Sequence, residues 1–231
     1  MSKIYCDSAD LNVIKKCIRK FNVHGVTTIP SIMRADGVKN YKSHCLKILK
    51  ITKKRSLSVE VFADKQNEIL NQAMKISNWS KKLFVKVPIV NTKGLFLTKV
   101  IKKLNSNGVK INITAVFTLS QVKKIKNSIN KKTPVIISIF CGRIADNGTN
   151  PEIIVKKTVA MFRTFKNVQI LWASTREVYN FFQAKNCGCH IITMSPKFIE
   201  KLKSKKISLN KFSVNTVKTF FDDGKKSRFK I

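Results

Sequence analysis

Acidic residues are scarce in this chain of 231 residues: 12 aspartates and glutamates stand against 46 lysines and arginines, for a formal net charge of +34. Such a balance ordinarily indicates a nucleic-acid or anionic-membrane partner. The lysines, however, are spread from Lys3 to Lys230, with no concentrated basic tail and no array of aromatics for base stacking. We therefore attribute the charge to codon bias in an AT-rich genome and expect no specific nucleic-acid partner. The charge could still attract phosphorylated substrates or bind RNA nonspecifically in vitro.

Long apolar runs are also missing, since no segment approaches the roughly 20 apolar residues that cross a bilayer. The first residues, Met-Ser-Lys-Ile-Tyr-Cys-Asp, lack the apolar core of a signal peptide. These two absences predict a cytoplasmic protein with no membrane partner.

Metal-binding and disulfide patterns are absent from the six cysteines. The nearest approach to a zinc motif is Cys187-Gly188-Cys189-His190, whose one-residue gap differs from the usual zinc pair. We interpret the cysteines as reduced thiols and expect no metal site.

Short β-rich runs alternate with amphipathic segments along the chain. The predicted strands are residues 3–6, 25–27, 57–62, 83–87, 110–116, 135–140, 169–173 and 190–194. The predicted helices are residues 12–21, 41–50, 65–77, 95–106, 119–128, 151–165, 175–185 and 197–203. Strands that alternate with helices are typical of a parallel sheet with crossover helices. We therefore predict an α/β fold, a single (β/α)₈ TIM barrel domain over residues 1–231.

Lys86 is the unusual residue of the run Leu-Phe-Val-Lys-Val-Pro at positions 83–88. On an edge strand its ammonium would point into water. In an internal strand it would lose hydration, so it would either reach a partner or become a neutral amine of the kind that forms Schiff bases. The hexapeptide alone leaves both interpretations open.

Other polar residues end or follow the predicted strands, and a barrel gathers such positions at its C-terminal mouth. They are Asp7, Thr27, Thr28, Glu60, Asn112, Thr114, Arg143, Ser174, Arg176 and Ser195. Each one alone is more commonly a core polar or a loop residue. Because Lys86 and several of these charged residues converge on one mouth, we predict a reaction site there.

Several motifs in strand order carry a family resemblance over nearly the whole chain. They are Asp7-Ser-Ala9, Gly25-Val-Thr-Thr-Ile-Pro-Ser31, Val59-Glu-Val61, Val85-Lys-Val-Pro88, Asn112-Ile-Thr114, Gly142-Arg-Ile144 and Ala173-Ser-Thr-Arg176. Together they make the chain resemble the transaldolases, and among them the short group that includes fructose-6-phosphate aldolase. Residues 209–222 look like the family's C-terminal helix. The resemblance implies a cofactor-free enzyme for sugar phosphates that forms a homo-oligomer, a pentamer or a decamer.

The resemblance also implies roles for individual residues. Lys86 would form a Schiff base with the ketose and hold a dihydroxyacetone unit as an enamine. Asp7 would take the proton of the C4 hydroxyl as the C3–C4 bond breaks, and Glu60 with Thr114 would position a catalytic water. The implied substrate-binding residues are Thr27, Thr28, Asn112 and, at the phosphate, Arg143, Ser174 and Arg176.

Two positions separate the branches of this family. Transaldolases resemble this chain in having Glu60 and Phe140, whereas fructose-6-phosphate aldolases carry Gln and Tyr there. The resemblance therefore implies transfer of the three-carbon unit to an acceptor aldehyde, as in the pentose phosphate pathway, rather than its release. Ile29 departs from the family pattern, in which an asparagine contacts the donor hydroxyls. Two alternatives stay open: a Schiff-base aldolase for another sugar phosphate, and a catalytically degraded basic barrel with a binding role.

Overall fold

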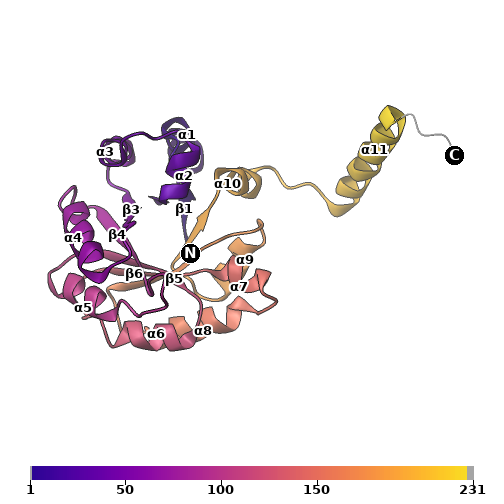
Figure 1. Ribbon diagram of the computed structural model, residues 1–231. Coiled ribbons are helices and arrows are strands. Elements are labelled where there is room, and N and C mark those ends of the chain that lie inside the picture. The colour runs from indigo at the N-terminus through magenta and orange to yellow at the C-terminus, as the bar shows by residue number, and fades with distance from the viewer. Residues whose placement is uncertain (1, 228–231) are drawn as a thin grey trace.

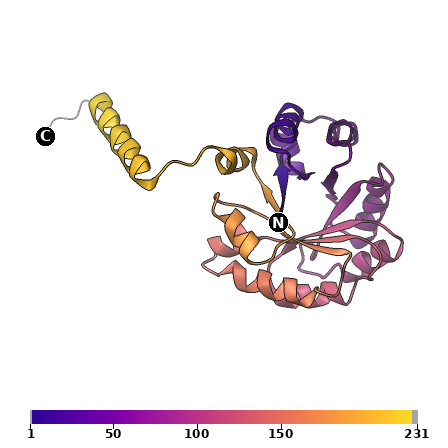
Figure 2. The same cartoon turned by 180° about the vertical axis from the view of Figure 1, so that it is seen from behind.

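Eight parallel strands close into a barrel in the computed structural model, which describes residues 2–227 (Figures 1 and 2). The strands follow one another around the barrel in chain order, and the last pairs with the first. They are β1 (Lys3–Asp7), β2 (Gly25–Thr27), β3 (Ser56–Glu60), β4 (Leu83–Pro88), β5 (Ile111–Val116), β6 (Val135–Ile139), β7 (Val168–Trp172) and β8 (Ile191–Met194). The predicted (β/α)₈ barrel is confirmed, and each predicted strand is correct to within two residues at either end.

The helices between the strands also follow the prediction, with two additions. Those predicted are α1 (Leu11–Phe21), α3 (Tyr41–Thr52), α4 (Gln66–Ser77), α5 (Thr98–Ser106), α6 (Leu119–Lys126), α8 (Pro151–Met161), α9 (Asn180–Asn186) and α10 (Pro196–Lys203). The additions are α2 (Pro30–Ala35) and α7 (Cys141–Asp146), each too short to show a helical period. Three predicted bounds are wrong: α5 begins at Thr98 and not at residue 95, α8 ends at Met161 and not at residue 165, and α9 begins at Asn180 and not at residue 175. Before α9 the chain first forms a loop in which Ser174 has a φ of 62°.

Capping residues start several of these helices. Asp10 precedes α1 and accepts hydrogen bonds from the main-chain N–H groups of Asn12 and Val13. Thr118 and Gln121 form a capping box at the start of α6. Each such cap contributes about 1 kcal/mol to stability. Because each helix runs back against its strand, the helix N-termini lie at the C-terminal end of the barrel and the helix C-termini at the N-terminal end.

The core has two layers, because side chains along a strand alternate between the faces of the sheet. The outer layer lies between strands and helices and includes Val85, Val87 and Ile137. A smaller cluster fills the barrel interior with Tyr5, Ile136, Leu171, Ala173 and Ile191. The Tyr5 ring lies over Gly25, where an added Cβ would come within 2.6 Å of a ring atom. Burial of each Val, Leu or Ile stabilises the fold by about 1.5–3 kcal/mol.

The last helix, α11 (Leu209–Ser227), stands apart from the barrel in both views (Figures 1 and 2). The predicted C-terminal helix at residues 209–222 is therefore confirmed, and it continues to Ser227. None of its residues is buried, and Leu209 is 86% exposed. Among residues 2–227, no helix is long and apolar enough to cross a membrane. That residues 1–231 form a single domain stays a prediction.

Candidate active site

Lys86 lies inside the barrel, near the C-terminal end of β4. Its neighbours Val85 and Val87 pack outward against the helices, whereas Phe84 packs against the interior cluster. Alternation therefore points the Lys86 side chain inward, and the residue is only 6% exposed. Because a closed barrel has no edge strand, the interpretation of Lys86 as an edge lysine in water is wrong.

Glu60 is the partner of this buried lysine. Strands β3 and β4 pair so that Glu60 lies opposite Lys86, and Lys86 Nζ is 3.1 Å from Glu60 Oε2. The two side chains are 7% and 21% exposed, so solvent screens their charges less than it would on the surface. Loss of either partner would leave an uncompensated charge in the barrel.

Asp7 ends β1, where it lies opposite Thr27 of β2. The Thr27 hydroxyl donates to Asp7 Oδ1 at 2.6 Å, and the hydroxyl oxygens of Thr27 and Thr193 are 2.6 Å apart. Since Thr27 has one hydroxyl hydrogen, Thr193 must be the donor to Thr27. Burial raises the pKa of Asp7, while the charge of Lys86 and the bond from Thr27 oppose this shift. A carboxyl group with a raised pKa is suited to proton transfer.

A second row of hydrogen-bonded polar side chains lies in the interior beside Lys86. Asn112 is adjacent to Lys86 in the pairing of β4 with β5 and is fully buried. Its amide nitrogen donates to Ser58 Oγ at 3.1 Å, and its carbonyl oxygen accepts from the Ser138 hydroxyl at 2.6 Å. These two bonds fix the orientation of the Asn112 amide next to the lysine.

The buried hydroxyls of Thr28 and Thr114 have no hydrogen-bond partner among the described residues. Thr114 lies opposite Pro88 near the end of β5, just before Ala115, whose φ is 55°. The pairing of β5 with β6 shifts at this point, as at bulges that re-aim side chains at barrel rims. A buried hydroxyl without a partner costs about 1–3 kcal/mol, so each of these two groups could gain from bonding a water or a ligand.

The two predicted phosphate arginines are exposed at the rim. Arg176 Nε and Nη2 contact Oδ2 of Asp146 at 3.0 and 2.5 Å. The hydrogen bonds from Arg176 lower the pKa of Asp146, and the charge of Arg143 adds to this effect. The Arg143 guanidinium carbon is 5.9 Å from the centre of the Phe140 ring. Asp146 therefore occupies the N–H groups of the Arg176 guanidinium that a phosphate would use.

A close contact between a loop and helix α7 brings Ser174 to the same part of the rim. A Cβ added to Gly142, in the first turn of α7, would lie 1.6 Å from the Ser174 carbonyl oxygen. Only glycine permits this approach. The contact places the loop that carries Ser174 and Arg176 against the helix that carries Arg143.

Four polar residues of this region were missed by sequence reasoning: Ser58, Ser138, Asp146 and Thr193. Ser58 and Thr193 could have been found, because each lies two residues before a predicted mouth residue, Glu60 or Ser195, and so shares its strand face. Asp146 could not, because its pairing with Arg176 depends on how a loop packs against α7.

Metal ligands do not gather at this site. Within residues 2–227, no group of three His, Cys, Asp or Glu side chains could hold a metal ion. The six cysteines are free and buried.

Comparison with known proteins relates this geometry to a family. The family described as "Transaldolase/Fructose-6-phosphate aldolase" matches residues 4–230. A protein named "Probable transaldolase" from Herpetosiphon aurantiacus is 31% identical over 201 residues, which are 87% of this chain and 86% of that protein. Another "Probable transaldolase", from Streptococcus agalactiae, is 30% identical over 202 residues, covering 87% of this chain and 89% of its own length.

Solved structures share the fold at low sequence identity. The 3-hexulose-6-phosphate synthase of Salmonella typhimurium superposes with a TM-score of 0.58 at 8% identity, over 87% of this chain and 97% of its own. This likeness concerns the barrel alone. The family match over nearly the whole length, with relatives at about 30% identity, shows that the chain belongs to the transaldolase/fructose-6-phosphate aldolase family.

Proposed function

We propose that this protein is a class I transaldolase, which transfers a dihydroxyacetone unit between sugar phosphates of the pentose phosphate pathway through a Schiff base on Lys86. The observation that carries the proposal is the Lys86 amine, buried in a closed barrel, 3.1 Å from Glu60 and electrostatically coupled to Asp7. A surface lysine would lack both the dry environment and the two carboxyl groups that proton transfer requires.

The first step of this proposed mechanism forms the covalent bond. Lys86 gives up a proton, for which Glu60 is the nearest acceptor, and the neutral amine attacks the C2 carbonyl of the ketose. Loss of the carbonyl oxygen as water leaves an iminium ion. Glu60 and the unpaired Thr114 hydroxyl would position the water that carries protons in this step.

The second step breaks the carbon–carbon bond. Asp7 takes the proton of the C4 hydroxyl, the C3–C4 bond breaks, and its electron pair flows into the iminium to give an enamine. The aldehyde product leaves, and an acceptor aldehyde then bonds to the enamine carbon as Asp7 returns the proton. Water then hydrolyses the resulting iminium, which frees the new ketose and the Lys86 amine. The raised pKa of Asp7 suits a group that takes and gives a proton in one cycle.

Substrate-binding roles follow in the same proposal. Asn112, fixed by Ser58 and Ser138, would bond a hydroxyl of the donor near the lysine. Arg143, Ser174 and Arg176 would hold the phosphate, because a guanidinium binds two phosphate oxygens at once. Thr27 and Thr28 would complete the donor site.

Trapping with borohydride tests the proposal. After incubation with fructose 6-phosphate and reduction, we expect one modified peptide, with the label on Lys86. Lys86→Met should lose the label, while Lys82→Ala, which removes an exposed lysine just before the same strand, should keep it. A label that sits on a surface lysine and survives Lys86→Met would refute the Schiff-base mechanism.

A second candidate function is a Schiff-base aldolase for another sugar phosphate, and Ile29 favours it. The resemblance to transaldolases implies an asparagine that contacts the donor hydroxyls, and this chain has an apolar side chain at that position. Assays of several ketose phosphate donors against erythrose 4-phosphate and glyceraldehyde 3-phosphate distinguish the two. If no donor turns over and no adduct is trapped, the chain is the catalytically degraded barrel instead.

We also propose that the chain forms a homo-oligomer, a pentamer or a decamer, in which α11 packs on a neighbouring copy. Support comes from six large apolar side chains of α11 that are all more than half exposed: Leu209, Phe212, Val214, Val217, Phe220 and Phe221. Burial of these side chains against a neighbouring copy would be favourable. Light scattering should show an oligomer, and truncation after Ser204 should reduce the number of subunits in it. A monomeric full-length chain would refute the proposal.

A further inference from the structure

Charges segregate along the barrel axis, although the sequence spreads its lysines evenly. The N-terminal face consists of Lys3 and the loops that lead into the strands: residues 22–24, 53–55, 78–82, 107–110, 127–134, 162–167 and 187–190. None of these loops contains Asp or Glu, so all 12 acidic residues of the chain lie elsewhere. Lysine or arginine occurs in every loop except 22–24 and 187–190, which each carry a histidine. The N-terminal face therefore has charge of one sign.

Helix dipoles account for part of this pattern, because the helix C-termini end at this face and favour cations. Lys82 Nζ donates to the Lys53 carbonyl and Lys110 Nζ to the Lys81 carbonyl, each at 2.9 Å. By contrast, several exposed lysines of this face have no side-chain hydrogen bond or ion pair among the described residues, and Lys3, Lys54 and Lys132 are among them. The N-terminal face thus carries more cations than are hydrogen-bonded to its main-chain carbonyls.

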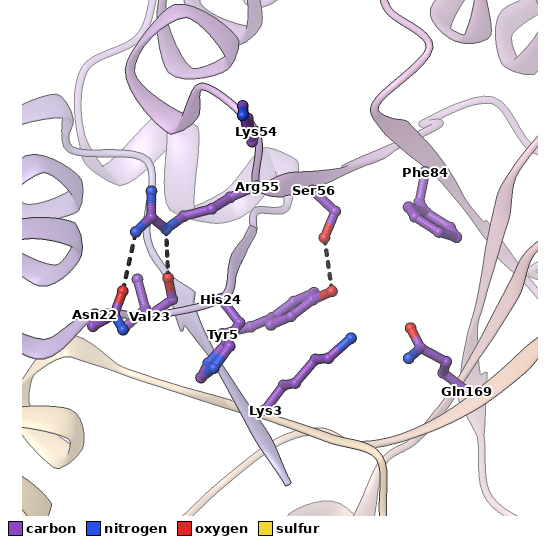
Figure 3. A pocket seen from close by; sticks show the side chains of 10 residues that line it. All are labelled: Lys3, Tyr5, Asn22, Val23, His24, Lys54, Arg55, Ser56, Phe84 and Gln169. Carbon is purple, nitrogen blue, oxygen red and sulfur yellow. Dashed lines mark hydrogen bonds between the residues drawn. The ribbon is translucent and has the colours of Figure 1, made fainter. Parts of the chain in front are cut away.

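A cavity of about 530 Å³ opens on this face (Figure 3). Lys86 lies near the other end of the barrel, toward the C-terminal end of β4. The cavity lining includes the cations of Lys3, Lys54 and Arg55 together with His24, and no carboxylate lines it. Figure 3 shows the Lys3 side chain extending beside the Tyr5 ring toward Gln169. The cavity therefore combines unpaired cations with polar donors.

Two of the cavity side chains are held in place by the main chain. Arg55 Nε donates to the Val23 carbonyl at 2.7 Å, which fixes its guanidinium at the cavity edge. His24 Nδ1 accepts from the Ile4 N–H at 3.3 Å, so the Nε2 nitrogen carries the proton and can donate. Fixed donors of this kind suit an oxyanion such as phosphate.

We propose that the N-terminal face binds the phosphate backbone of nucleic acid without selecting a sequence, with the cavity holding one of the phosphates. A chain of regularly spaced phosphates can contact several separated lysines at once and release counterions from its own backbone. A small phosphate would reach only the lysines around the cavity. An anionic membrane fits less well, because none of the large apolar side chains exposed among the described residues lies on this face to insert between lipids.

Two charge-reversal variants of the full-length protein test whether position or net charge governs binding. The first carries Lys3→Glu, Lys54→Glu and Lys132→Glu. The control carries Lys15→Glu, Lys99→Glu and Lys157→Glu, which replace exposed lysines in α1, α5 and α8, away from the N-terminal face. Both variants change the net charge equally. Fluorescence anisotropy with a labelled single-stranded RNA of mixed sequence, over a salt series, gives Kd for each.

We expect the first variant to bind about tenfold or more weakly than the wild type at physiological salt. Its plot of log binding constant against log salt should be shallower by about 2, the value for three lost phosphate contacts on a single strand. The control should change Kd far less. Borohydride trapping at Lys86 should be equal in all three proteins, since neither set of lysines belongs to the reaction site.

Three results would overturn the inference. If both variants lose affinity equally, net charge alone drives the binding. Tighter binding to phosphatidylserine vesicles than to RNA, lost in the first variant only, would assign the face to a membrane. Absence of RNA binding by the wild type at low salt would leave the face with no nucleic-acid partner.

Discussion

Ile29 offers the sharpest test of the proposed donor site. The resemblance to transaldolases implies an asparagine at this position. Ile29 precedes α2 with φ −139° and ψ 157° and no side-chain capping bond. Its side chain is half-buried but packs against neither core cluster of the described residues. An asparagine at this position could therefore have two effects: it could bond a donor hydroxyl, and it could cap α2.

These two effects have different magnitudes and different observables. A donor hydroxyl left unbonded by isoleucine costs about 1–3 kcal/mol, so Ile29→Asn should speed transfer about tenfold or more. A cap on α2 adds about 1 kcal/mol to the free energy of unfolding, which raises Tm by about 2–4 °C in a chain of this size. We expect Ile29→Asn to show both gains.

Ile29→Ser is the matched control, because serine caps a helix about as well as asparagine but its side chain is too short to reach a donor hydroxyl. We expect it to raise Tm without raising the rate. The assay is kcat/KM for transfer from fructose 6-phosphate to erythrose 4-phosphate, with Tm measured by circular dichroism on the same samples.

Two results would refute this reasoning. Equal rate gains in the Asn and Ser variants would assign the effect to the order of α2 and not to the donor. A fast wild type that is slowed by Ile29→Asn would mean that the pocket is built around an apolar contact and that the natural donor lacks the hydroxyl.

The other predictions concern Asp7, the arginines and Phe140. Burial raises the pKa of Asp7, so its ionisation disfavours folding above the folded-state pKa and has no effect below the unfolded-state value. Asp7→Asn should therefore resist urea better than the wild type at neutral pH, lose this advantage on acidification and lose transfer activity; an advantage that grows on acidification would contradict this. Arg176→Ala should lower kcat/KM for fructose 6-phosphate about tenfold or more, whereas Asp146→Asn should raise it about two- to fivefold by freeing the guanidinium. An equal loss on unphosphorylated fructose in Arg176→Ala would show that Arg176 serves the fold. Phe140→Tyr should increase the release of free dihydroxyacetone relative to transfer, because a hydroxyl there can guide water to the bound unit; a wild type that already releases it as fast as it transfers it would place the chain in the aldolase branch.

Local patterns in the sequence were enough to predict the barrel. Alternating β-rich and amphipathic segments depend on residues near one another in the chain, so the strands were located to within two residues. The short helices α2 and α7 were not predicted, because six residues are too few to show a helical period. The oddity of Lys86 was also visible locally, as a charge among strand-forming residues.

Contacts between distant residues were decided only by the tertiary structure. Closure of the barrel turned Lys86 inward, and the register of β3 with β4 set Glu60 opposite to it. The bond between Thr27 and Thr193 joins positions 166 residues apart, and the pairing of Arg176 with Asp146 depends on a loop that packs against α7 at Gly142. The segregation of charge to the N-terminal face has the same origin. An even spread of lysines along the chain says nothing about which of them share an end of the barrel, because that depends on where each helix and strand ends in space.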